Sequence, residues 1–194
     1  MKRSTGKILT THVGSLPQLH ALDPASSDYE AKLKDDVAAI VAKQREIGLD
    51  VVNEGEYTKG GDWLSYLDHR FGGYTEQPPK LLPLASQGKD REEFADFYRY
   101  ATERGTLFFM PGNQTRTVRP TWICTGPVTY QAQRELAREI AMLKALVPTD
   151  AAFLTTTAPA SLEVYRRNEY YKTEEDYLFS IAGGIGVEYE AIVA

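Results

Sequence analysis

Apolar residues in the first part of the chain follow two different periods. The run from Ile8 to Val13 is rich in β-branched residues and ends in Gly-Ser-Leu-Pro, which predicts a buried strand followed by a tight loop. From Tyr29 to Ile47 apolar residues recur every three or four positions, as on one face of an α-helix. A second β-branched run, Leu49 to Asn53, ends in Glu-Gly-Glu at residues 54–56. The pattern predicts a strand, a helix and a second strand.

The same alternation returns near the end of the chain. Thr121 to Cys124 is predicted to be a strand, and Gln131 to Leu146 a helix with one apolar face. Ala151 to Thr155 is predicted to be a further strand. A final helix is expected to begin at Thr173, because threonine caps helices well and acidic residues follow it in the first turn.

Residues 57 to 115 interrupt this alternation. Asp62 to Arg70 and Arg91 to Glu103 are both helical in pattern, whereas the glycine pair at 72–73 and the proline pair at 78–79 break the periodicity. The segment from Arg91 to Phe109 is also rich in aromatic residues, which are typical of helix core packing or of a wall for a flat ligand. We expect an excursion from the main body here.

Near-continuous apolar strands that alternate with helices indicate the α/β class with a parallel sheet, because parallel strands need long crossover connections. A closed (β/α)8 TIM barrel needs about 250 residues. The 194 residues, with the first four strand–helix units present, would therefore form half of a barrel. An open doubly wound sheet is the alternative.

Composition and charge limit the classes of function that this chain can have. The net charge is -5 and the basic residues are scattered among the acidic ones, which indicates small-molecule chemistry and no nucleic-acid partner. No apolar run is long enough for a membrane span or a signal peptide, so we expect a cytoplasmic protein with no membrane partner. Cys124 is the single cysteine, and an inert buried thiol is favoured over a nucleophile there.

Candidate chemistry collects after each predicted strand, where parallel α/β folds bind ligands. Gly14 and Ser15 either present backbone N–H groups to a carboxylate or form a plain turn. In an extended chain the side chains of Glu54 and Glu56 point the same way, and Glu56 is the better candidate for binding a substrate ammonium. The alternative is that these carboxylates cap the next segment or pair with a nearby Lys59 or Arg70. The polar residues after the strands are His12, Gly14, Ser15, Glu54, Glu56, Thr125, Thr129, Thr155, Thr156 and Thr157.

His12 is either a proton carrier or metal ligand, or a hydrogen-bonded structural residue, which is favoured because no second histidine or cysteine lies near it in sequence. The sequence contains no glycine-rich phosphate loop, nucleophile elbow or paired-histidine metal motif. These absences argue against nucleotide transferases, α/β-hydrolases and zincin proteases.

Several motifs in order resemble one family. They are Thr-Thr-His-Val-Gly-Ser-Leu-Pro at 10–17, Asn-Glu-Gly-Glu at 53–56, Thr-Gly-Pro-Val-Thr at 125–129, Ala-Pro-Ala-Ser at 158–161 and Glu-Tyr at 188–189. Together they span nearly the whole chain and resemble cobalamin-independent methionine synthase. The resemblance is to the short, single-barrel members, which are similar to the catalytic domain of the long enzyme and include epoxyalkane:coenzyme M transferases.

This resemblance implies a (β/α)8 TIM barrel of the methionine synthase and uroporphyrinogen decarboxylase type, with residues 1–194 as its amino-terminal half and an excursion at about 57–115. It implies an S-methyltransferase of methionine biosynthesis, in which zinc binds the thiol of homocysteine and 5-methyltetrahydrofolate or a related molecule donates the methyl group. The implied substrate-binding residues are His12, Val13, Gly14, Ser15 and Glu56, and those of the donor pocket are Thr125, Gly126, Pro127 and Thr129.

The family's zinc ligands are expected beyond residue 194, so no catalytic residue and no metal ligand is assigned within this chain. The thiol and the methyl donor are then the partners, and a homo-oligomer is compatible with the pattern. Three alternatives remain: alkyl transfer to coenzyme M, a uroporphyrinogen decarboxylase-like enzyme, and a non-catalytic truncated fragment. A half-barrel exposes strand edges, so we expect the isolated chain to associate.

Overall fold

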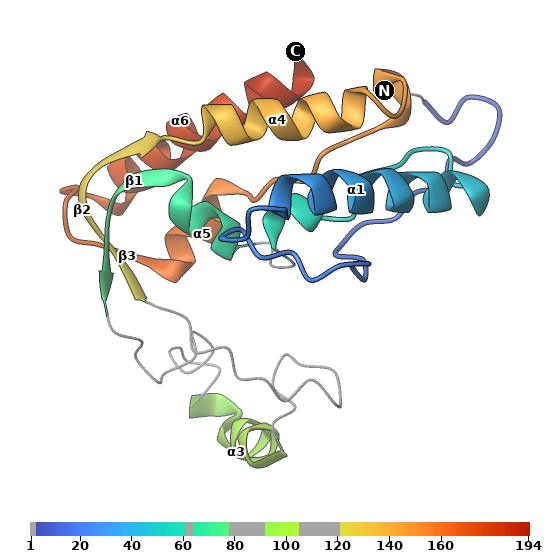
Figure 1. Ribbon diagram of the computed structural model, residues 1–194. Helices are drawn as coiled ribbons and strands as arrows, with labels where there is room; N and C mark the ends of the chain where they lie inside the picture. Colours follow the sequence, from blue (N-terminus) through green and yellow to red (C-terminus); the bar gives the residue numbers. More distant parts are fainter. Residues whose placement is uncertain (1–2, 61–63, 78–91, 105–120) are drawn as a thin grey trace.

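The computed structural model describes residues 3–60, 64–77, 92–104 and 121–194 (Figure 1). Helices and strands alternate irregularly along these residues. In chain order the elements are the helix α1 (Tyr29–Glu46), the 3-10 helices η1 (Tyr57–Lys59) and η2 (Ser65–His69), the strand β1 (Phe71–Gln77), the helix α3 (Ala95–Arg104), the strand β2 (Thr121–Tyr130), the helix α4 (Gln133–Lys144), the 3-10 helix η4 (Thr149–Ala151), the helix α5 (Pro159–Tyr165), the strand β3 (Arg166–Asn168) and the helix α6 (Glu174–Val193).

The three long predicted helices are confirmed as α1, α4 and α6. In α1 the periodic residues Leu33, Val37 and Val41 are at most 2% exposed, so the predicted apolar face is the buried one. Helix α6 begins where expected, because the Thr173 hydroxyl accepts the backbone N–H of Asp176 at 3.0 Å.

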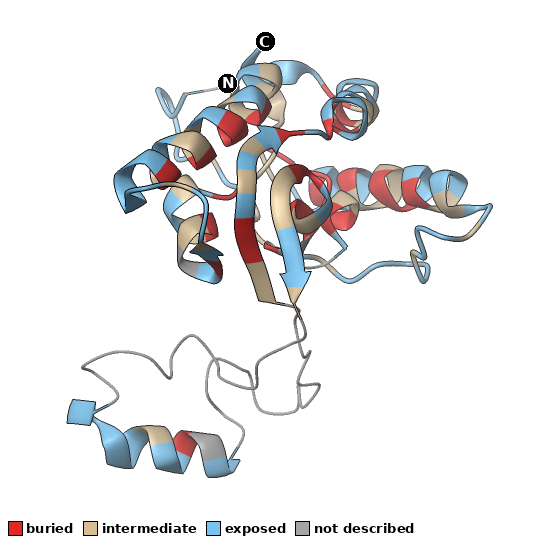
Figure 2. Ribbon diagram, turned by 90° about the vertical axis from the view of Figure 1, so that its left-hand side faces the viewer, coloured by how far each residue is buried: buried red, intermediate tan, exposed pale blue. Residues whose placement is uncertain are grey.

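Buried apolar side chains form two clusters, and α4 contributes to both of them (Figure 2). Its Leu136 packs with residues of η2, β1, β2, α5 and α6. Its Leu143 packs with α1 and with Val52 and Tyr57. In Figure 1 α1 and α4 run side by side, with α6 behind α4. Helix α4 therefore joins the sheet-side core to the core beneath α1.

The sheet differs from the predicted one. It has three strands in the order β1-β2-β3; β1 pairs antiparallel with β2, and β3 pairs parallel with it. The expected strand at Thr121 to Cys124 continues to Tyr130, and β1 was not predicted, because its two glycines were taken as breakers. Gly73 instead lies at a register shift in the pairing, with φ 91. The glycine that suggested a break thus lies within the paired strand, opposite the extra residues 125–128 of β2.

The other three expected strands are reduced or absent. Ile8 to Val13 forms no strand; Ile8 is 86% and Val13 67% exposed. A buried parallel strand needs neighbours along both edges, and within the described residues this segment has backbone bonds only to residues 50 and 51, through the carbonyl of Thr10. The prediction of a buried strand there was wrong.

The runs at 49–53 and 151–155 meet in a single parallel bridge between Val52 and Ala152. The Val52 N–H donates to the carbonyl of Ala151 at 3.0 Å, and the Phe153 N–H donates to that of Val52 at 3.1 Å. Parallel pairing of these two runs is therefore present, although neither is a full strand. The α/β class is confirmed, whereas four strand–helix units of a barrel are not observed among the described residues.

The excursion is partly described. The helix expected at 91–103 is present as α3, which lies apart from the sheet and the other helices in Figure 1. Its Phe94, Phe97 and Tyr100 are each more than half exposed, so they belong to neither main cluster. Phe108 and Phe109 lie outside the described residues. The helix expected at 62–70 is the 3-10 helix η2 over the part of it that is described.

Candidate functional site

Buried Asn53 ties the loop after the first apolar run to the segment that carries the glutamates. Its side-chain amide donates to the carbonyl of His12 at 2.5 Å, and its side-chain oxygen accepts the N–H of Gly55 at 2.8 Å. Gln44 of α1 in turn donates to the carbonyl of Asn53 at 2.7 Å and accepts its N–H at 3.2 Å. The loop at 12–16 is closed by the Leu16 N–H, which donates to the carbonyl of Gly55 at 3.0 Å. Helix α1 therefore fixes both segments together.

The backbone turns sharply between the two glutamates. Gly55 has φ 73 and Glu56 has φ 59, and Glu56 is the only non-glycine residue with positive φ in the described part of the chain. A left-handed conformation costs such a residue about 1–2 kcal/mol, and such strain is often kept at functional sites. The expectation that Glu54 and Glu56 lie in an extended chain was wrong, and their carboxylates have different partners.

The Glu56 carboxylate is buried and is held by hydroxyl groups. Its residue is 7% exposed; Ser15 Oγ donates to Oε2 at 2.8 Å and Thr155 Oγ1 donates to Oε1 at 3.1 Å. Within the described ranges no lysine, arginine or histidine forms an ion pair with it. A buried carboxylate without a positive partner is costly, so this position favours a cation from a ligand.

Glu54 takes the structural role that the sequence left open for either glutamate. Lys59 Nζ lies 3.7 Å from its Oε1, which also accepts the Thr58 hydroxyl at 3.2 Å. Its Oε2 is buried and has no hydrogen-bond partner. Lys59 also donates to Thr155 Oγ1 at 2.6 Å, so Glu54, Lys59, Thr155 and Glu56 form one connected network.

A second buried network is centred on Glu188 of α6. Its two carboxylate oxygens accept hydrogen bonds from Tyr66, Arg70, Tyr130 and Thr156 at 2.6–3.3 Å. Because Thr156 follows Thr155 directly, this network holds the loop that reaches Glu56. Burial and the nearby Glu188 charge raise the pKa of Tyr66 to about 12, so its phenol stays protonated.

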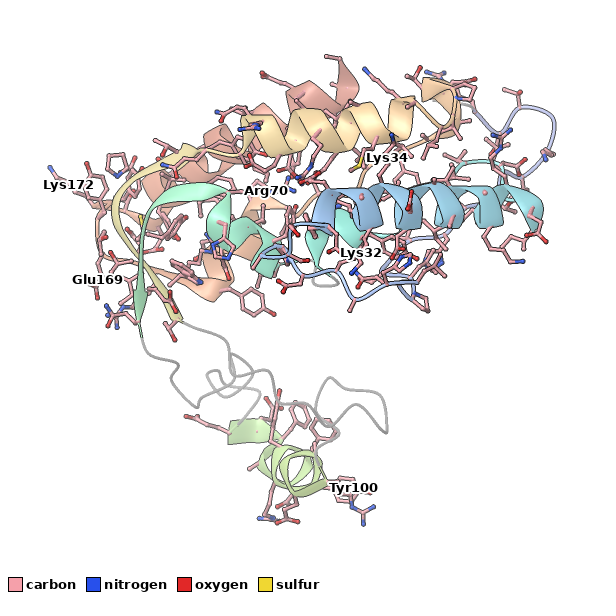
Figure 3. All side chains as sticks on the ribbon, in the orientation of Figure 1. Lys32, Lys34, Arg70, Tyr100, Glu169 and Lys172 are labelled. Carbon is pink, nitrogen blue, oxygen red and sulfur yellow. The ribbon has the colours of Figure 1, made fainter. Side chains whose placement is uncertain are left out.

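Arg70 joins Glu188 to Glu139 of α4, with which it forms a second buried ion pair. Figure 3 shows Arg70 among the central elements, whereas Lys172 and Glu169 lie at the edge of the molecule. Burial raises the pKa of Glu139, although Arg70 opposes the shift. The sequence reasoning did not find Glu139, but its place on the buried stripe of α4 between Leu136 and Leu143 was a usable signal.

The remaining residues of the predicted substrate loop differ in their hydrogen bonds, backbone conformation and exposure. His12 forms a ring hydrogen bond with the carbonyl of Gly14 at 3.0 Å, which is the structural role favoured from the sequence. Gly14 has φ 105, which only glycine adopts readily, and Val13 is 67% exposed. Ser15 is the loop residue whose side chain contacts Glu56.

The residues predicted to border a donor pocket were expected in a loop beyond Cys124, and that placement was wrong. They lie within β2, where they face or pair with residues of β1. The Thr125 and Thr75 hydroxyls are 2.7 Å apart. Gly126 and Pro127 face Gly73, and Thr129 pairs with Gly72. Their proposed ligand contacts therefore remain a prediction.

Zinc does not fit the residues that the structure describes. Cys124 is fully buried, its thiol donates to the carbonyl of Gly126 at 3.3 Å, and burial raises its pKa, whereas a zinc ligand must be a thiolate. No group of three or more histidine, cysteine, aspartate or glutamate residues in the described ranges could hold a metal ion. We derive no step through a metal from this chain.

No helix among the described residues is long and apolar enough to cross a membrane.

The described residues form an α/β protein with a buried carboxylate, Glu56, that has no positively charged partner among them. No protein-family model matches the chain. A methionine synthase from Sulfolobus acidocaldarius is 24% identical over 194 residues, which cover 95% of this chain and 48% of that protein.

Two solved structures of B12-independent methionine synthases are similar to this chain in fold. The B12-independent methionine synthase from Shewanella sp. W3-18-1, in complex with selenomethionine, matches with a TM-score of 0.62 and 15% identity, over 94% of this chain and 47% of that one. A putative vitamin-B12 independent methionine synthase from Listeria monocytogenes matches with a TM-score of 0.51 and 18% identity, over 84% and 39%. The predicted resemblance to cobalamin-independent methionine synthases is confirmed, and the chain spans about half the length of the curated relative it matches.

Proposed function

We propose that these residues form the amino-terminal half of a methyltransferase that moves a methyl group to the thiol of an amino acid, and that Glu56 binds the α-ammonium group of that amino acid. The observation that carries the proposal is the buried Glu56 carboxylate, which two hydroxyls hold and which has no cationic partner in the part of the chain that the structure describes. An ammonium group has three donors and one positive charge, and so meets both needs of this carboxylate.

The adjacent loop suits the other end of an amino acid. Gly14 and Ser15 lead directly to Glu56 through the Ser15 hydroxyl, and no atom lies within 4 Å of the place that a Cβ on Gly14 would take. The proposal assigns the substrate carboxylate to the backbone N–H groups of this loop, since such groups bind anions well. The loop and Glu56 would then hold the two charged groups of one α-amino acid.

The fuller function follows from the resemblance. In this proposal the thiol is homocysteine, a 5-methyltetrahydrofolate-type donor lies beside Thr125, Gly126, Pro127 and Thr129, and the second half of a (β/α)8 barrel supplies the zinc ligands. When bound, zinc would lower the pKa of the thiol and so provide the nucleophile. The residues of this half bind and orient the amino acid.

The same observation argues against the alternatives. Coenzyme M carries a sulfonate and no ammonium group, so a buried carboxylate would repel it. The substrate of a uroporphyrinogen decarboxylase carries several carboxylates, which the Glu56 charge would also oppose. An α-amino thiol fits the charge of the site better than either.

The test uses the complete polypeptide that contains these residues and compares two ligands by calorimetry. L-methionine, the expected product, carries the ammonium group, and 4-(methylthio)butanoate lacks it. We expect Glu56→Gln to weaken methionine binding by about 2 kcal/mol or more, roughly 30-fold, as expected for removal of one partner of a buried ion pair, and to leave the other ligand unchanged.

Glu169→Gln is the matched control, because Glu169 is exposed and pairs with Arg167 on the surface. Unchanged methionine affinity in the Glu56→Gln protein would refute the assignment. Metal content and methyl transfer by the same polypeptide would test the remaining part of the proposal, for which about one zinc ion per barrel is expected.

A further inference from the structure

Lys59 is a buried lysine at the edge of the proposed ammonium site. It is 5% exposed, its Nζ lies 2.6 Å from Thr155 Oγ1 and 3.7 Å from Glu54 Oε1, and it stands 5.5 Å from the centre of the Tyr66 ring. A buried lysine is rare unless its charge is paired or has a function. Lys59 therefore brings a buried positive charge close to Glu56.

The donor and the acceptor of each hydrogen bond between Lys59, Thr155 and Glu56 can be assigned. A lysine ammonium can only donate, so Thr155 Oγ1 accepts from Lys59. The single hydroxyl proton of Thr155 is then left for Glu56 Oε1, 3.1 Å away. Lys59, Thr155 and Glu56 thus form a relay in which each hydrogen bond has one defined direction.

The hydrogen bonds of the relay do not occupy all the acceptor positions of the Glu56 carboxylate. Lys59 contacts Thr155 and Glu54 and does not pair with Glu56, so its charge offsets that of Glu54. Glu56 Oε1 accepts one hydroxyl and Oε2 another, which leaves lone pairs on both oxygens. Glu56 therefore keeps an unpaired negative charge, while the hydroxyl groups of Ser15 and Thr155 fix the orientation of its carboxylate from two sides.

Backbone geometry couples the two ends of the relay. The Lys59 N–H donates to the carbonyl of Glu56 at 3.0 Å within η1, and Gly60 ends that turn with φ 64. The turn places Lys59 one short helical turn after Glu56, whereas Thr155 comes from the segment that pairs with Val52. Two segments distant in sequence are therefore joined at one hydroxyl.

We propose that Lys59 is a positioning residue that sets the preference of this site for a primary ammonium, by fixing the Glu56 carboxylate through the Thr155 hydroxyl. The inference rests on the proposed function of Glu56. Lys59 itself does not contact the ligand in this arrangement. Loss of the relay lets Thr155 turn away and Glu56 rotate, so the ammonium-bearing ligand loses affinity while the ligand without it does not.

The experiment measures dissociation constants of the complete polypeptide for L-methionine and for 4-(methylthio)butanoate. The measured quantity is the ratio of the two constants, because a general structural defect weakens both ligands alike. Thr155→Val and Lys59→Met are expected to reduce the preference for methionine about tenfold, the effect of one hydrogen bond to a charged group. Thr155→Ser keeps the hydroxyl and is expected to restore the preference.

Lys32→Met is the control for loss of a lysine, since Lys32 lies on the exposed side of α1 and pairs with Asp28. Circular dichroism of each variant checks folding, and if Lys59→Met does not fold, the Thr155→Val and Thr155→Ser pair decides alone. A preference retained by both Thr155→Val and Lys59→Met, with Glu56→Gln still abolishing it, overturns the relay and leaves the proposed function standing. Equal loss for both ligands also overturns the relay. A wild-type protein without any preference for methionine overturns the function of Glu56 and the relay with it.

Discussion

Gly73 offers a decisive test of how the antiparallel pairing of β1 with β2 is built. Its φ is 91, and a Cβ added there would lie 2.3 Å from the carbonyl oxygen of Pro127 and 2.8 Å from that of Gly126. Both contacts are with backbone atoms of the paired strand, which cannot move without loss of the pairing. Gly73→Ala should therefore disrupt the strand pairing at this register shift.

The magnitude follows from two costs. A residue with a Cβ in a left-handed conformation loses about 1–2 kcal/mol, and overpacking against neighbours that cannot move costs about 1–3 kcal/mol. We expect Gly73→Ala to lower the free energy of unfolding by about 3 kcal/mol, which is about 6–12 °C in Tm for a protein of this size. Urea unfolding monitored by circular dichroism, together with a thermal scan, measures both.

Gly72→Ala is the matched control in the same strand. Its Cβ would meet the side-chain ends of Gln131 at 2.3 Å and Thr129 at 2.8 Å, and these can rotate away. The cost should stay below about 1 kcal/mol. If Gly73 were only a flexible breaker, alanine would be neutral or stabilising by about 0.5–1 kcal/mol. That result, or equal losses at the two glycines, would refute the role of Gly73 in the strand pairing.

Three further outcomes are expected. Burial raises the pKa of Glu139 above its ordinary value of 4.5, so the stability it contributes is present below that pH and is lost as pH rises through the raised value. Wild type should lose stability relative to Glu139→Gln as the pH rises above 4.5 and through the raised pKa of Glu139, and parallel urea-derived curves would contradict this. Cys124 is fully buried with a raised pKa, so a thiol reagent should modify it only after unfolding, and fast labelling of the native protein would show the burial to be wrong. The 194-residue chain alone exposes Ile8, Val13 and Leu19, so light scattering should detect self-association, and a stable monomer would argue against it.

The helices could be predicted because their signal is local. The apolar stripe of α1 and the Thr173 cap of α6 each lie within a few residues in sequence, and both appear as predicted. The strands were predicted less completely, because pairing depends on residues far away in sequence: the run at 121–124 lies within β2 as expected, whereas β1 was not predicted and 8–13 forms no strand. Nothing near Gly72 and Gly73 shows that this segment lies against residues 121–130, whereas the β-branched run at 8–13 has strand propensity but few partners.

The sequence predicted part of the candidate site, because that part also depends on signals that are local in the chain. Ser15 and Glu56 stand at the ends of apolar runs, and the structure brings them together at 2.8 Å. Lys59 was named only as a possible partner of Glu54 or Glu56, and Glu188 was not linked to any network, since single charged residues usually belong to a solvated surface. Only their burial, 5% and 1% exposed, shows that they form the interior networks.

The two buried networks have the same charges but different ion pairs. Each contains two buried carboxylates and one buried cation, but Arg70 pairs with both Glu139 and Glu188, whereas Lys59 pairs with Glu54 and not with Glu56.

The Tyr66 ring lies beside both cations, 5.5 Å from Lys59 and 4.7 Å from Arg70, and so stands between the networks. In the second network burial raises the pKa of Glu139, and the Arg70 charge opposes that shift. In the first, Lys59 pairs with Glu54, and the Ser15 hydroxyl from the adjacent loop donates to Glu56. Under the proposed function, the ammonium group of the ligand balances the charge that remains on Glu56.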